Sequence, residues 1–581
     1  MTQRPITRRQ LMVGGSVAAA SALGAGLGIA KYRSGRESKP IVVAPSTVAS
    51  AASGPSLMPT AIPRRGGVAR VPSPGRFNFD TFDTQRTGEP SVLEVLGRTH
   101  SRLLDWGDSA DPILVPGLAT SWEQPETGTV LFHLDLRARW DSRSPTNGRA
   151  VTADDLRAHF ARQSKLANGA LPLAQRPADF ANLQISMPGK STVMVQAGDD
   201  PWALQTFASR YALIQAPEAV DAFAAAWAEA RPDQVVGTGA FRFTGRRDGG
   251  PLVFEAARGG HVEPDLDGLE VFEPGSPDDM LALQVDEYLA RDRREAATLR
   301  TGGRLVELSR YEDSPVISTF FVGAQPWNNP ALLRALSGAL NRGWLSQALF
   351  GGRADPCGPI SPASGNYAPR QGELAKFAGF GTAAEAEARA AKAAWDAAGG
   401  AGLGPVTIDI PSIFDPLYSA SSVVIGRLNE VLGPQFRAAV ETYTTISAKT
   451  ADGRYGNGRA AFWFGWGPPL LEPDPSRALI ETYSSTGPNA GALGLKPGPL
   501  DAKLAAIARA PQSGRDAATA GAVLAILEDG GSGIITWLLQ RSELFRWPYL
   551  SGATPSPFWR QHLDSSRTLA PTDSLYPRRA P

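Results

Sequence analysis

The most constraining feature of the sequence is a run in which a strand pattern passes through a turn into a helix start. From Val130 to Arg137 apolar and polar residues largely alternate, which is the period of a strand with one buried face. Turn-forming residues occupy 142–148, and Thr152 then precedes Asp154 and Asp155. A hydroxyl and two carboxylates at this place satisfy the unpaired N–H groups of a helix start. The order of strand, turn and capped helix predicts an α/β domain.

The chain is too long for a single domain of this kind. Its 581 residues exceed what one compact core usually contains, so at least two domains share it. The 58 Lys and Arg residues are balanced by 57 Asp and Glu residues, and the net charge of +1 provides no field to attract nucleic acid. We therefore expect a soluble body without a nucleic-acid partner.

Residues 1–30 have the pattern of an export signal. Arg8 and Arg9 precede residues 11–30, which carry no charge and are rich in Ala, Gly and Leu. Paired arginines in this setting resemble the twin-arginine signal, which directs folded proteins to a translocase. An uncleaved membrane anchor and a chance apolar terminus are the alternatives, and the cleavage position stays open. Residues 31–65, rich in Ser, Ala and Pro, predict a disordered linker.

The residues of the first run also resemble a known protein family. Within Pro116–Leu156 the chain has Pro-x-Leu-Ala-x-Ser-Trp-Glu, then a Phe-His-Leu-x-Leu-Arg strand and a Thr-Ala-Asp-Asp helix start. This stretch resembles the extracellular solute-binding proteins of family 5, the dipeptide, oligopeptide and nickel binders of ABC transporters. The likeness continues in the same order through 236–243, 334–342 and 464–475, so it covers roughly residues 66–550.

The resemblance implies an α/β protein with the two-lobed periplasmic-binding-protein fold, type II, of the large peptide-binding subclass. Its ligand cleft would lie between the lobes. We expect lobe I over 66–310, lobe II over 311–535, and a return to lobe I with a C-terminal tail over 536–581. The chain is expected to cross to lobe II near 306–322 and to return near 534–547.

The function that this resemblance implies is solute capture for an ABC importer. The protein would bind a small molecule (peptide-like, opine, sugar or chelate) and deliver it to an ABC permease in the inner membrane. It would be a periplasmic monomer without enzymatic activity. A sensory module that passes lobe closure to a signalling partner is the alternative, and an extracytoplasmic hydrolase is a third class.

Three segments supply the candidates for ligand contact. The first matches the family's cleft tryptophan, the second is a loop that in similar proteins approaches the ligand backbone, and the third is an arginine at a position that holds an anionic ligand group. A core tryptophan, a solvated turn and a surface arginine are the respective alternatives. In this order the candidates are Trp466 and Gly467, then Thr87, Gly88 and Glu89, then Arg454.

One departure from the family pattern bears on the ligand. In peptide binders of the family, an aspartate a few residues after the Gly-Trp pair holds the α-ammonium group of the ligand. Here residues 467–471 read Gly-Pro-Pro-Leu-Leu, and proline has no group that binds a cation. Glu472 or Asp474 could substitute only if the loop is rebuilt. This argues against a free-amine peptide, whereas modified peptides, opines, sugars and other polar metabolites stay open.

The sequence predicts no catalytic residue, no metal site and no cofactor. Cys357 is the only cysteine, and its neighbours Pro356 and Gly358 indicate a lone thiol in a loop. The five histidines show no paired spacing of the kind that metal ligands have.

Overall fold

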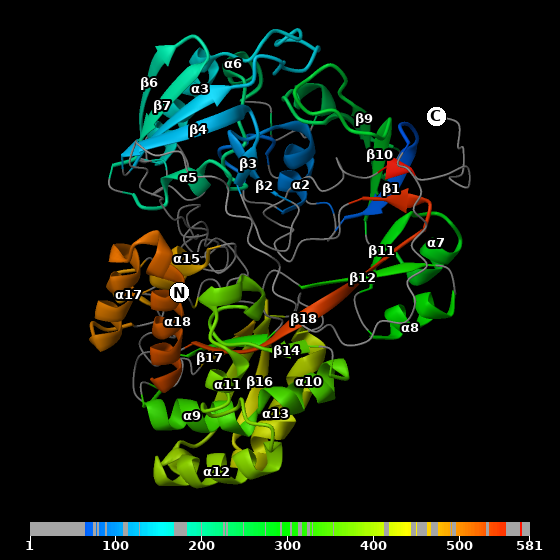
Figure 1. Cartoon of the computed structure of the whole chain (residues 1–581). Coiled ribbons are helices and arrows are strands. Elements are labelled where there is room, and N and C mark those ends of the chain that lie inside the picture. Colours follow the sequence, from blue (N-terminus) through cyan, green and yellow to red (C-terminus); the bar gives the residue numbers. More distant parts are fainter. Residues whose placement is uncertain are drawn as a thin grey trace, which may run out of the picture.

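A single long strand, β18 (Ile534–Arg546), is hydrogen-bonded in two parts of the molecule (Figure 1). Its first half pairs antiparallel with β13 (Ile317–Phe321) and β14 (Ala354–Pro356). Its second half pairs antiparallel with β11 (Glu287–Ala290) and β12 (Val306–Tyr311). Strands β12, β13 and β18 are the segments for which we predicted the two crossings between lobes.

The computed structural model describes residues 64–552 and 570–571, apart from a set of internal ranges. The internal ranges that it does not describe are 74–76, 78, 80, 88–89, 108–113, 127, 168–179, 181–182, 199, 225–226, 228–230, 248, 274, 291–292, 303–304, 312–316, 322–325, 328, 353, 412–416, 443–444, 446–448, 450–461, 466–473, 488–489, 491–494 and 530–533. The predicted signal over 1–30 and nearly all of the predicted linker therefore lie outside the described residues. Among the described helices, none is both long and apolar enough to cross a membrane.

The first body contains two four-stranded sheets, in the orders β1-β10-β9-β8 and β4-β5-β7-β6, around one hydrophobic core. The alternation predicted for Val130–Arg137 is confirmed over Val130 to Leu134, because Val130, Phe132 and Leu134 are buried whereas Leu131 and His133 between them are partly exposed. Its strands are β1 (Val68–Pro72), β2 (Leu104–Trp106), β3 (Leu114–Pro116), β4 (Ala119–Glu126), β5 (Thr129–Leu134), β6 (Gln184–Gly189), β7 (Thr192–Gln196), β8 (Phe241–Arg246), β9 (Leu252–Ala256) and β10 (Gly268–Phe272). Its helices are α2 (Pro90–Thr99), α3 (Ala153–Ala167), α5 (Ala203–Thr206), α6 (Pro217–Phe223) and the 3-10 helix η2 (Pro232–Gln234).

The start of α3 is built as the sequence predicts. The Thr152 hydroxyl accepts a hydrogen bond from the Asp155 N–H (3.4 Å), and the Asp155 carboxylate accepts one from the Thr152 N–H (2.8 Å), which is a capping box. Burial opposes the charge of Asp155, but hydrogen bonds from Arg149 (2.7 Å) and the Trp140 indole (3.2 Å) hold the pKa of this carboxyl below its ordinary value. The Asp155 carboxylate therefore has a structural role at the start of α3.

The second body is a mixed sheet covered by helices, with a core of its own. From β18 the strands follow the order β13-β17-β15-β16, in which β15, β16 and β17 are parallel to one another and β13 is antiparallel to β17. These further strands are β15 (Val406–Pro411), β16 (Phe436–Glu441) and β17 (Phe462–Gly465). The helices are α9 (Pro330–Ala339), α10 (Arg342–Phe350), η3 (Pro362–Tyr367), α11 (Gln371–Leu374), α12 (Ala384–Ala397), η4 (Gly400–Gly402), α13 (Leu417–Leu432), α15 (Ser476–Tyr483), α17 (Pro499–Arg509) and α18 (Gln512–Glu528).

The two bodies are connected through a smaller unit, which we call the joint. It consists of α7 (Pro277–Leu281), α8 (Arg293–Thr301), β11, β12 and the second half of β18, and it has a separate small core. After β18 the chain reaches the first body, where Tyr549 and Leu550 are part of the core. The short strands β19 (Leu550–Ser551) and β20 (Ala570–Pro571) pair there.

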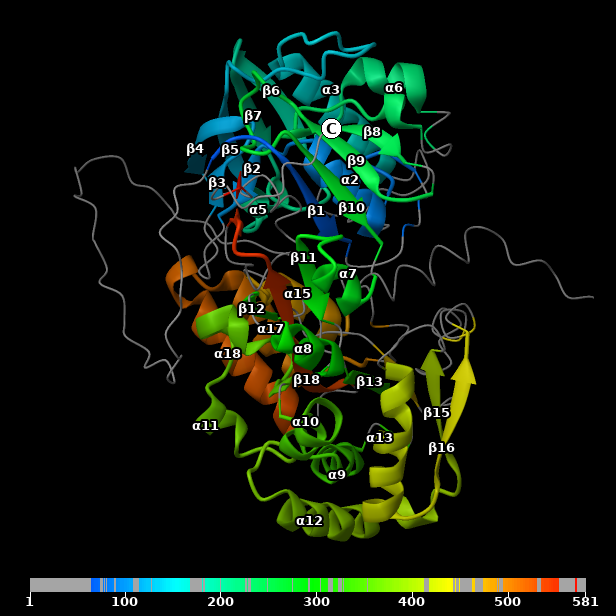
Figure 2. The same cartoon turned by 90° about the vertical axis from the view of Figure 1, so that its right-hand side faces the viewer.

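Figures 1 and 2 show the first body above and the second body below, with the joint between them at one side. The predicted two-lobed α/β fold is confirmed, while the exact lobe boundaries stay predictions.

A buried ion pair fixes the joint to the first body. The Asp286 carboxylate accepts hydrogen bonds from the Arg70 guanidinium (2.8 Å), the Arg70 backbone N–H (2.7 Å) and the Tyr549 hydroxyl (2.8 Å). The side chains of Arg70 and Asp286 are only 8% and 2% exposed. Within the joint, Arg546 of β18 donates to Glu287 of β11 (2.5 Å).

Candidate functional site

The carboxyl ends of the parallel strands β15, β16 and β17 lie at one edge of the sheet in the second body. In open α/β sheets this edge is the usual place for a ligand. Strand β17 ends at Gly465, directly before Trp466 and Gly467, and α15 begins at Ser476. Trp466, Gly467 and the more distant Arg454 lie outside the described residues, so their roles stay predictions.

The side chain of Asp474 is hydrogen-bonded to the first residue of α15. Its carboxylate accepts hydrogen bonds from the Ser476 N–H (3.0 Å) and from the Ser476 hydroxyl, and the residue is 3% exposed. Burial raises the pKa of Asp474. One carboxylate oxygen of Asp474 thus binds the first residue of α15, and the use of Asp474 as a substitute cation ligand stays the conditional alternative given above. Glu472 lies outside the described residues.

An ionic cluster lies near the ends of β15 and β16. Lys449 donates hydrogen bonds to Asp409 (2.8 Å) and to Glu441 (3.1 Å), and Asp409 is paired in register with Trp463 of β17. Burial opposes the charge on Lys449, but these two carboxylates raise the pKa of its ammonium group. The cluster has one positive and two negative groups, so it is a negatively charged feature beside β17.

Thr87 belongs to a loop that is held tightly in the first body. Thr87 is fully buried, and its N–H donates to the carbonyl of Asp83 (3.1 Å), so it is no solvated turn. The Asp83 carboxylate accepts two hydrogen bonds from Arg162 of α3 (2.9 and 2.5 Å), and Gln85 donates to the carbonyl of His159 (2.8 Å). This anchoring fixes the backbone that leads to Gly88 and Glu89, which are themselves outside the described residues.

His159, on which this loop rests, is held neutral. Its Nδ1 accepts a hydrogen bond from the backbone N–H of Gln215 (3.1 Å), which places the proton of the neutral ring on Nε2. Burial, and secondarily the charge of Arg162, lower the pKa of His159 to about 3. The histidine is therefore a structural group at neutral pH.

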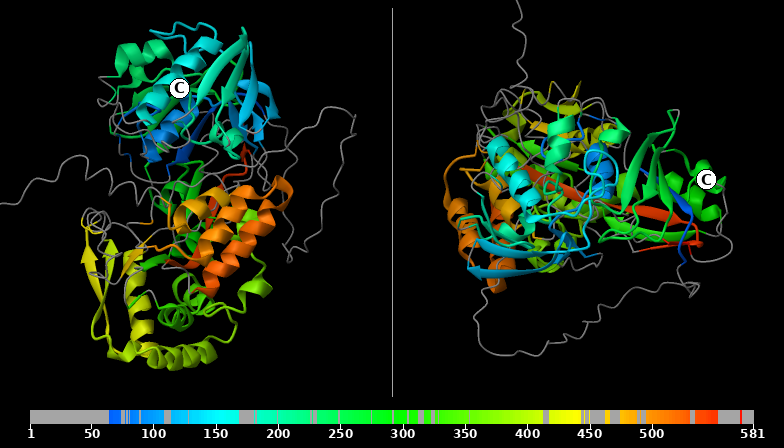
Figure 3. Two further views of the ribbon diagram at one scale, coloured as in Figure 1. Left: turned by 90° about the vertical axis from the view of Figure 1, so that its left-hand side faces the viewer. Right: turned by 90° about the horizontal axis from the view of Figure 1, so that it is seen from above.

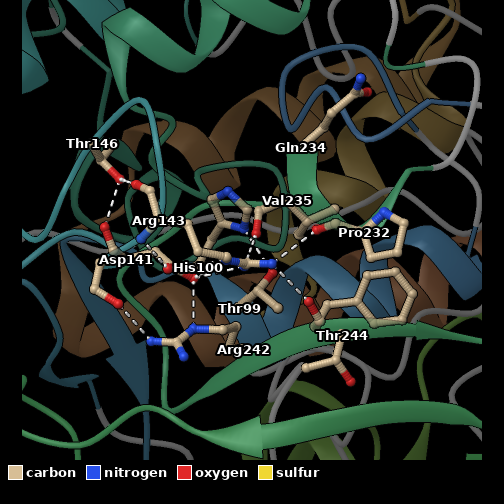
Figure 4. Close-up of polar contacts among 12 residues, drawn as sticks. Thr99, His100, Asp141, Arg143, Thr146, Pro232, Gln234, Val235, Arg242 and Thr244 are labelled. Atoms are coloured by element: carbon tan, nitrogen blue, oxygen red, sulfur yellow. Dashed lines mark hydrogen bonds and ion pairs between the residues drawn. The ribbon is translucent and has the colours of Figure 1, made fainter.

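Figure 4 shows a polar network in the first body, where the side chains of Arg143 and Arg242 converge on Asp141. The Arg143 guanidinium also donates to the carbonyls of Pro232 (3.1 Å), Val235 (2.6 Å) and Phe243 (3.0 Å). Burial opposes the charge of Asp141, but the pKa of this carboxyl is lowered by its hydrogen bonds with Arg143. One guanidinium thus holds the segment from η2 to β8 against the turn after β5.

The glycine turn that resembles the family pattern is part of the same packing. A Cβ on Gly237 would lie 2.0 Å from the carbonyl oxygen of Thr99, and one on Gly239 would lie 2.4 Å from that of Arg98. The turn therefore passes so close to the end of α2 that only glycine fits at both positions. We assign these glycines to the close packing of the turn on α2.

A pocket near this turn is too small for an organic ligand. Its volume of about 30 Å³ suits a water molecule, and its lining includes His100, Arg102, Asp105 and His261. Burial lowers the pKa of His100 to about 4, so this imidazole is neutral. Among the described residues, no three His, Cys, Asp or Glu side chains are grouped closely enough to bind a metal ion.

The two bodies touch through side chains from α5 and the segment before it in the first body, and from α15 and α18 in the second. Arg477 of α15 lies 3.8 Å from the Asp200 carboxylate and 6.0 Å from the ring centre of Trp202. Arg515 of α18 lies 5.2 Å from the same ring centre. Ile480 packs against the cores of both bodies. The segment 466–473 therefore precedes a helix that contacts the other body.

With this geometry established, comparison with protein families identifies the chain. A model of the bacterial extracellular solute-binding proteins, family 5 (middle region), matches residues 114–489. The chain belongs to this family. A comparison with curated proteins gave no match.

Solved structures with the same fold cover almost the whole of this family 5 protein. One is the periplasmic binding protein DppA from Helicobacter pylori in complex with the peptide STSA (TM-score 0.68, 17% identity, covering 88% of this chain and 99% of that one). Another is AgaA from A. tumefaciens in complex with agropinic acid (TM-score 0.65, 17% identity, 87% and 99%). A third is OppA from Haemophilus influenzae in complex with RPPGFSPFR (TM-score 0.65, 17% identity, 88% and 100%). At this identity the likeness establishes the fold alone.

Sequence reasoning on this family 5 protein missed the contact between the two bodies. Trp202 is separated from Arg477 and Arg515 by more than half of the described chain, and no spacing pattern links them. The Lys449 cluster was missed because the parallel pairing of β15 with β16, which brings Asp409 and Glu441 near Lys449, leaves no spacing pattern in the sequence. One sequence feature could have pointed to the contact between the bodies, namely that the predicted cleft segment is directly followed by the helix α15.

Proposed function

We propose that this family 5 protein is the extracytoplasmic solute-binding component of an ABC importer. It captures a polar small molecule between its two bodies and delivers it to a permease in the inner membrane. The observation that carries this proposal is the architecture. Two bodies with separate cores are connected at one side by the strands of the joint, so they can close over a ligand and open again.

The candidate ligand contacts come from both bodies. Trp466 and Gly467 follow the sheet edge of the second body, and an aromatic face there would provide contact area at small entropic cost. Thr87, Gly88 and Glu89 continue a loop whose backbone is fixed in the first body. Arg454 would hold an anionic group of the ligand. These roles follow from the family resemblance and from the positions of the flanking elements.

The ligand is a polar metabolite that does not rely on a free α-ammonium group. Residues 467–471 offer prolines where the peptide binders have an aspartate, and Asp474 is hydrogen-bonded to the N–H of Ser476 at the start of α15. A modified peptide, an opine or a sugar fits this better than an unmodified peptide. The protein acts by binding and performs no reaction of its own.

Mass spectrometry of the purified full-length protein under native conditions tests this function. A bound small molecule is expected, and a thermal-shift panel of an unmodified tripeptide, an N-acylated tripeptide, an opine and an oligosaccharide should give an increase in Tm with a class other than the first. Trp466→Ala should abolish that increase, whereas Trp122→Ala, which alters a tryptophan on the hairpin of β4 and β5, should retain it. Failure of all four classes, together with no co-purified molecule, would contradict the proposal.

Export is tested separately by cell fractionation. Replacing both Arg8 and Arg9 by Lys keeps the charge but removes the arginine pair that the twin-arginine translocase recognises. The variant should accumulate in the cytoplasmic fraction, while the natural sequence reaches the periplasm. Equal export of both would refute the twin-arginine route and leave solute binding untouched.

A further inference from the structure

The contact between the two bodies is centred on one tryptophan. Trp202 is 8% exposed, and it lies between β7 and α5 in the first body. The Arg515 guanidinium approaches its ring to 5.2 Å and that of Arg477 to 6.0 Å, within the range of cation–π attraction. Asp200, two residues earlier, faces Arg477 at 3.8 Å. An aromatic ring and a carboxylate of one body thus meet two guanidinium groups of the other.

Apolar contacts surround this polar centre. Ile480 of α15 packs against both cores, and Ala508 of α17 packs against the core of the first body. The contact therefore excludes water on part of its area, which strengthens the attraction between ring and cation. On the side of the second body, its side chains come from α15, α17 and α18.

The contact around Trp202 lies on the side of the molecule away from the joint. Figure 1 shows α5 above α15 at one side of the molecule, with β11 and β12 toward the other side, and the left view of Figure 3 shows the orange helices α15, α17 and α18 directly below the first body. When the two bodies rotate about the joint, the parts that lie farthest from the joint move most. The Trp202 contact is thus made only when the two bodies are close together.

We propose that Trp202, Asp200 and the two guanidinium groups that face them form a latch that stabilises the closed arrangement of the two bodies without touching the ligand. This inference rests on the proposed function for its purpose, since a ligand binder gains affinity when closure costs less free energy. The latch consists of protein side chains alone. It therefore sets the balance between open and closed forms before any ligand arrives.

Small-angle X-ray scattering of the ligand-free full-length protein tests the latch. Trp202→Ala should shift the ratio of closed to open molecules about tenfold toward the open form, seen as a larger radius of gyration. Arg477→Gln should act in the same direction. The double variant should shift the ratio by less than the two single effects combined, because both changes remove one interaction. Trp202→Phe keeps a ring and should give an intermediate shift.

The control is another cation–π pair that lies within one body. Arg246 stands 5.2 Å from the ring centre of Phe77 in the first body, so Arg246→Gln should leave the radius of gyration unchanged. The latch is refuted if folded Trp202→Ala scatters as the natural sequence does, or if Arg246→Gln opens the protein equally. Should Trp202→Ala fail to fold, Trp202→Phe and Arg477→Gln decide the matter in the same way. A ligand panel that gives no binding would contradict the proposed function but not this result.

Discussion

Removing the Asp286 carboxylate should destabilise the protein more than any exposed charge does. In Asp286→Ala the Arg70 guanidinium stays buried but loses its counter-charge, and the Tyr549 hydroxyl loses its acceptor. Breaking a buried pair in this way costs about 3–5 kcal/mol of unfolding free energy. For a unit of 150–250 residues each kcal/mol lowers Tm by roughly 2–4 °C, so the transition of the first body should fall by about 6–20 °C.

Differential scanning calorimetry measures this change, since a two-body protein need not unfold in one step. Asp286→Asn, which keeps the shape and loses only the charge, should fall between the natural sequence and the alanine variant. Asp267→Asn is the matched control, because Asp267 lies in the first body but is 65% exposed in its pair with Arg258, and such a pair contributes about 1 kcal/mol or less. A fall below about 2 °C for Asp286→Ala would refute the argument that this pair holds the joint.

Three further predictions concern single positions. Gly237→Ala should lower the unfolding free energy by more than about 2 kcal/mol, because the added Cβ would meet the Thr99 carbonyl and force the backbone to shift. Gly426→Ala, on an exposed part of α13 with open space around it, should instead raise the unfolding free energy by roughly 0.5–1 kcal/mol, and urea unfolding measures both changes. Burial lowers the pKa of His159 from 6.5 to about 3, so between these pH values the unfolded chain binds a proton that the folded protein does not. The unfolding free energy should therefore fall by roughly 1.4 kcal/mol per pH unit as the pH drops from 6.5 to about 3; His159→Gln should flatten this slope, and an unchanged slope would contradict the prediction. Burial raises the pKa of the Cys357 thiol to about 12, so iodoacetamide should leave it unmodified in the native protein and alkylate it fully in concentrated guanidinium chloride; rapid native labelling would show that the loop opens.

Local features of the fold could be predicted from the sequence, because they depend on neighbours along the chain. The alternation over Val130–Leu134 and the capping box of Thr152 and Asp155 are examples, and both are found in the structure. The family resemblance extended this to the two-lobed architecture. Such patterns are specific because each residue's role is decided within one turn or one strand.

Contacts between distant segments could not be predicted in this way. Arg70 and Asp286 lie 216 positions apart, and nothing in their surroundings marks them as partners. Asp474 illustrates the converse: a carboxylate that the sequence offered as a ligand group only if its loop is rebuilt accepts a hydrogen bond from the N–H of Ser476 at the start of α15. Side chains of the same chemistry serve folding or function, and only the three-dimensional packing separates the two. The candidate site itself centres on Trp466, whose role stays a prediction.

The sharing of β18 has a consequence for how the protein is made. The strands β11, β12, β13 and β14 all obtain a hydrogen-bonding partner from residues 534–546, which the ribosome makes after all four of these strands. Until β18 is made, β14 has no strand partner among the described residues and β13 is bonded on one side only, to β17. Tyr549 and Leu550, which belong to the core of the first body, also follow β18. The synthesis of this strand therefore completes the sheet and the joint together, and a chain truncated before residue 534 should be a target for proteases.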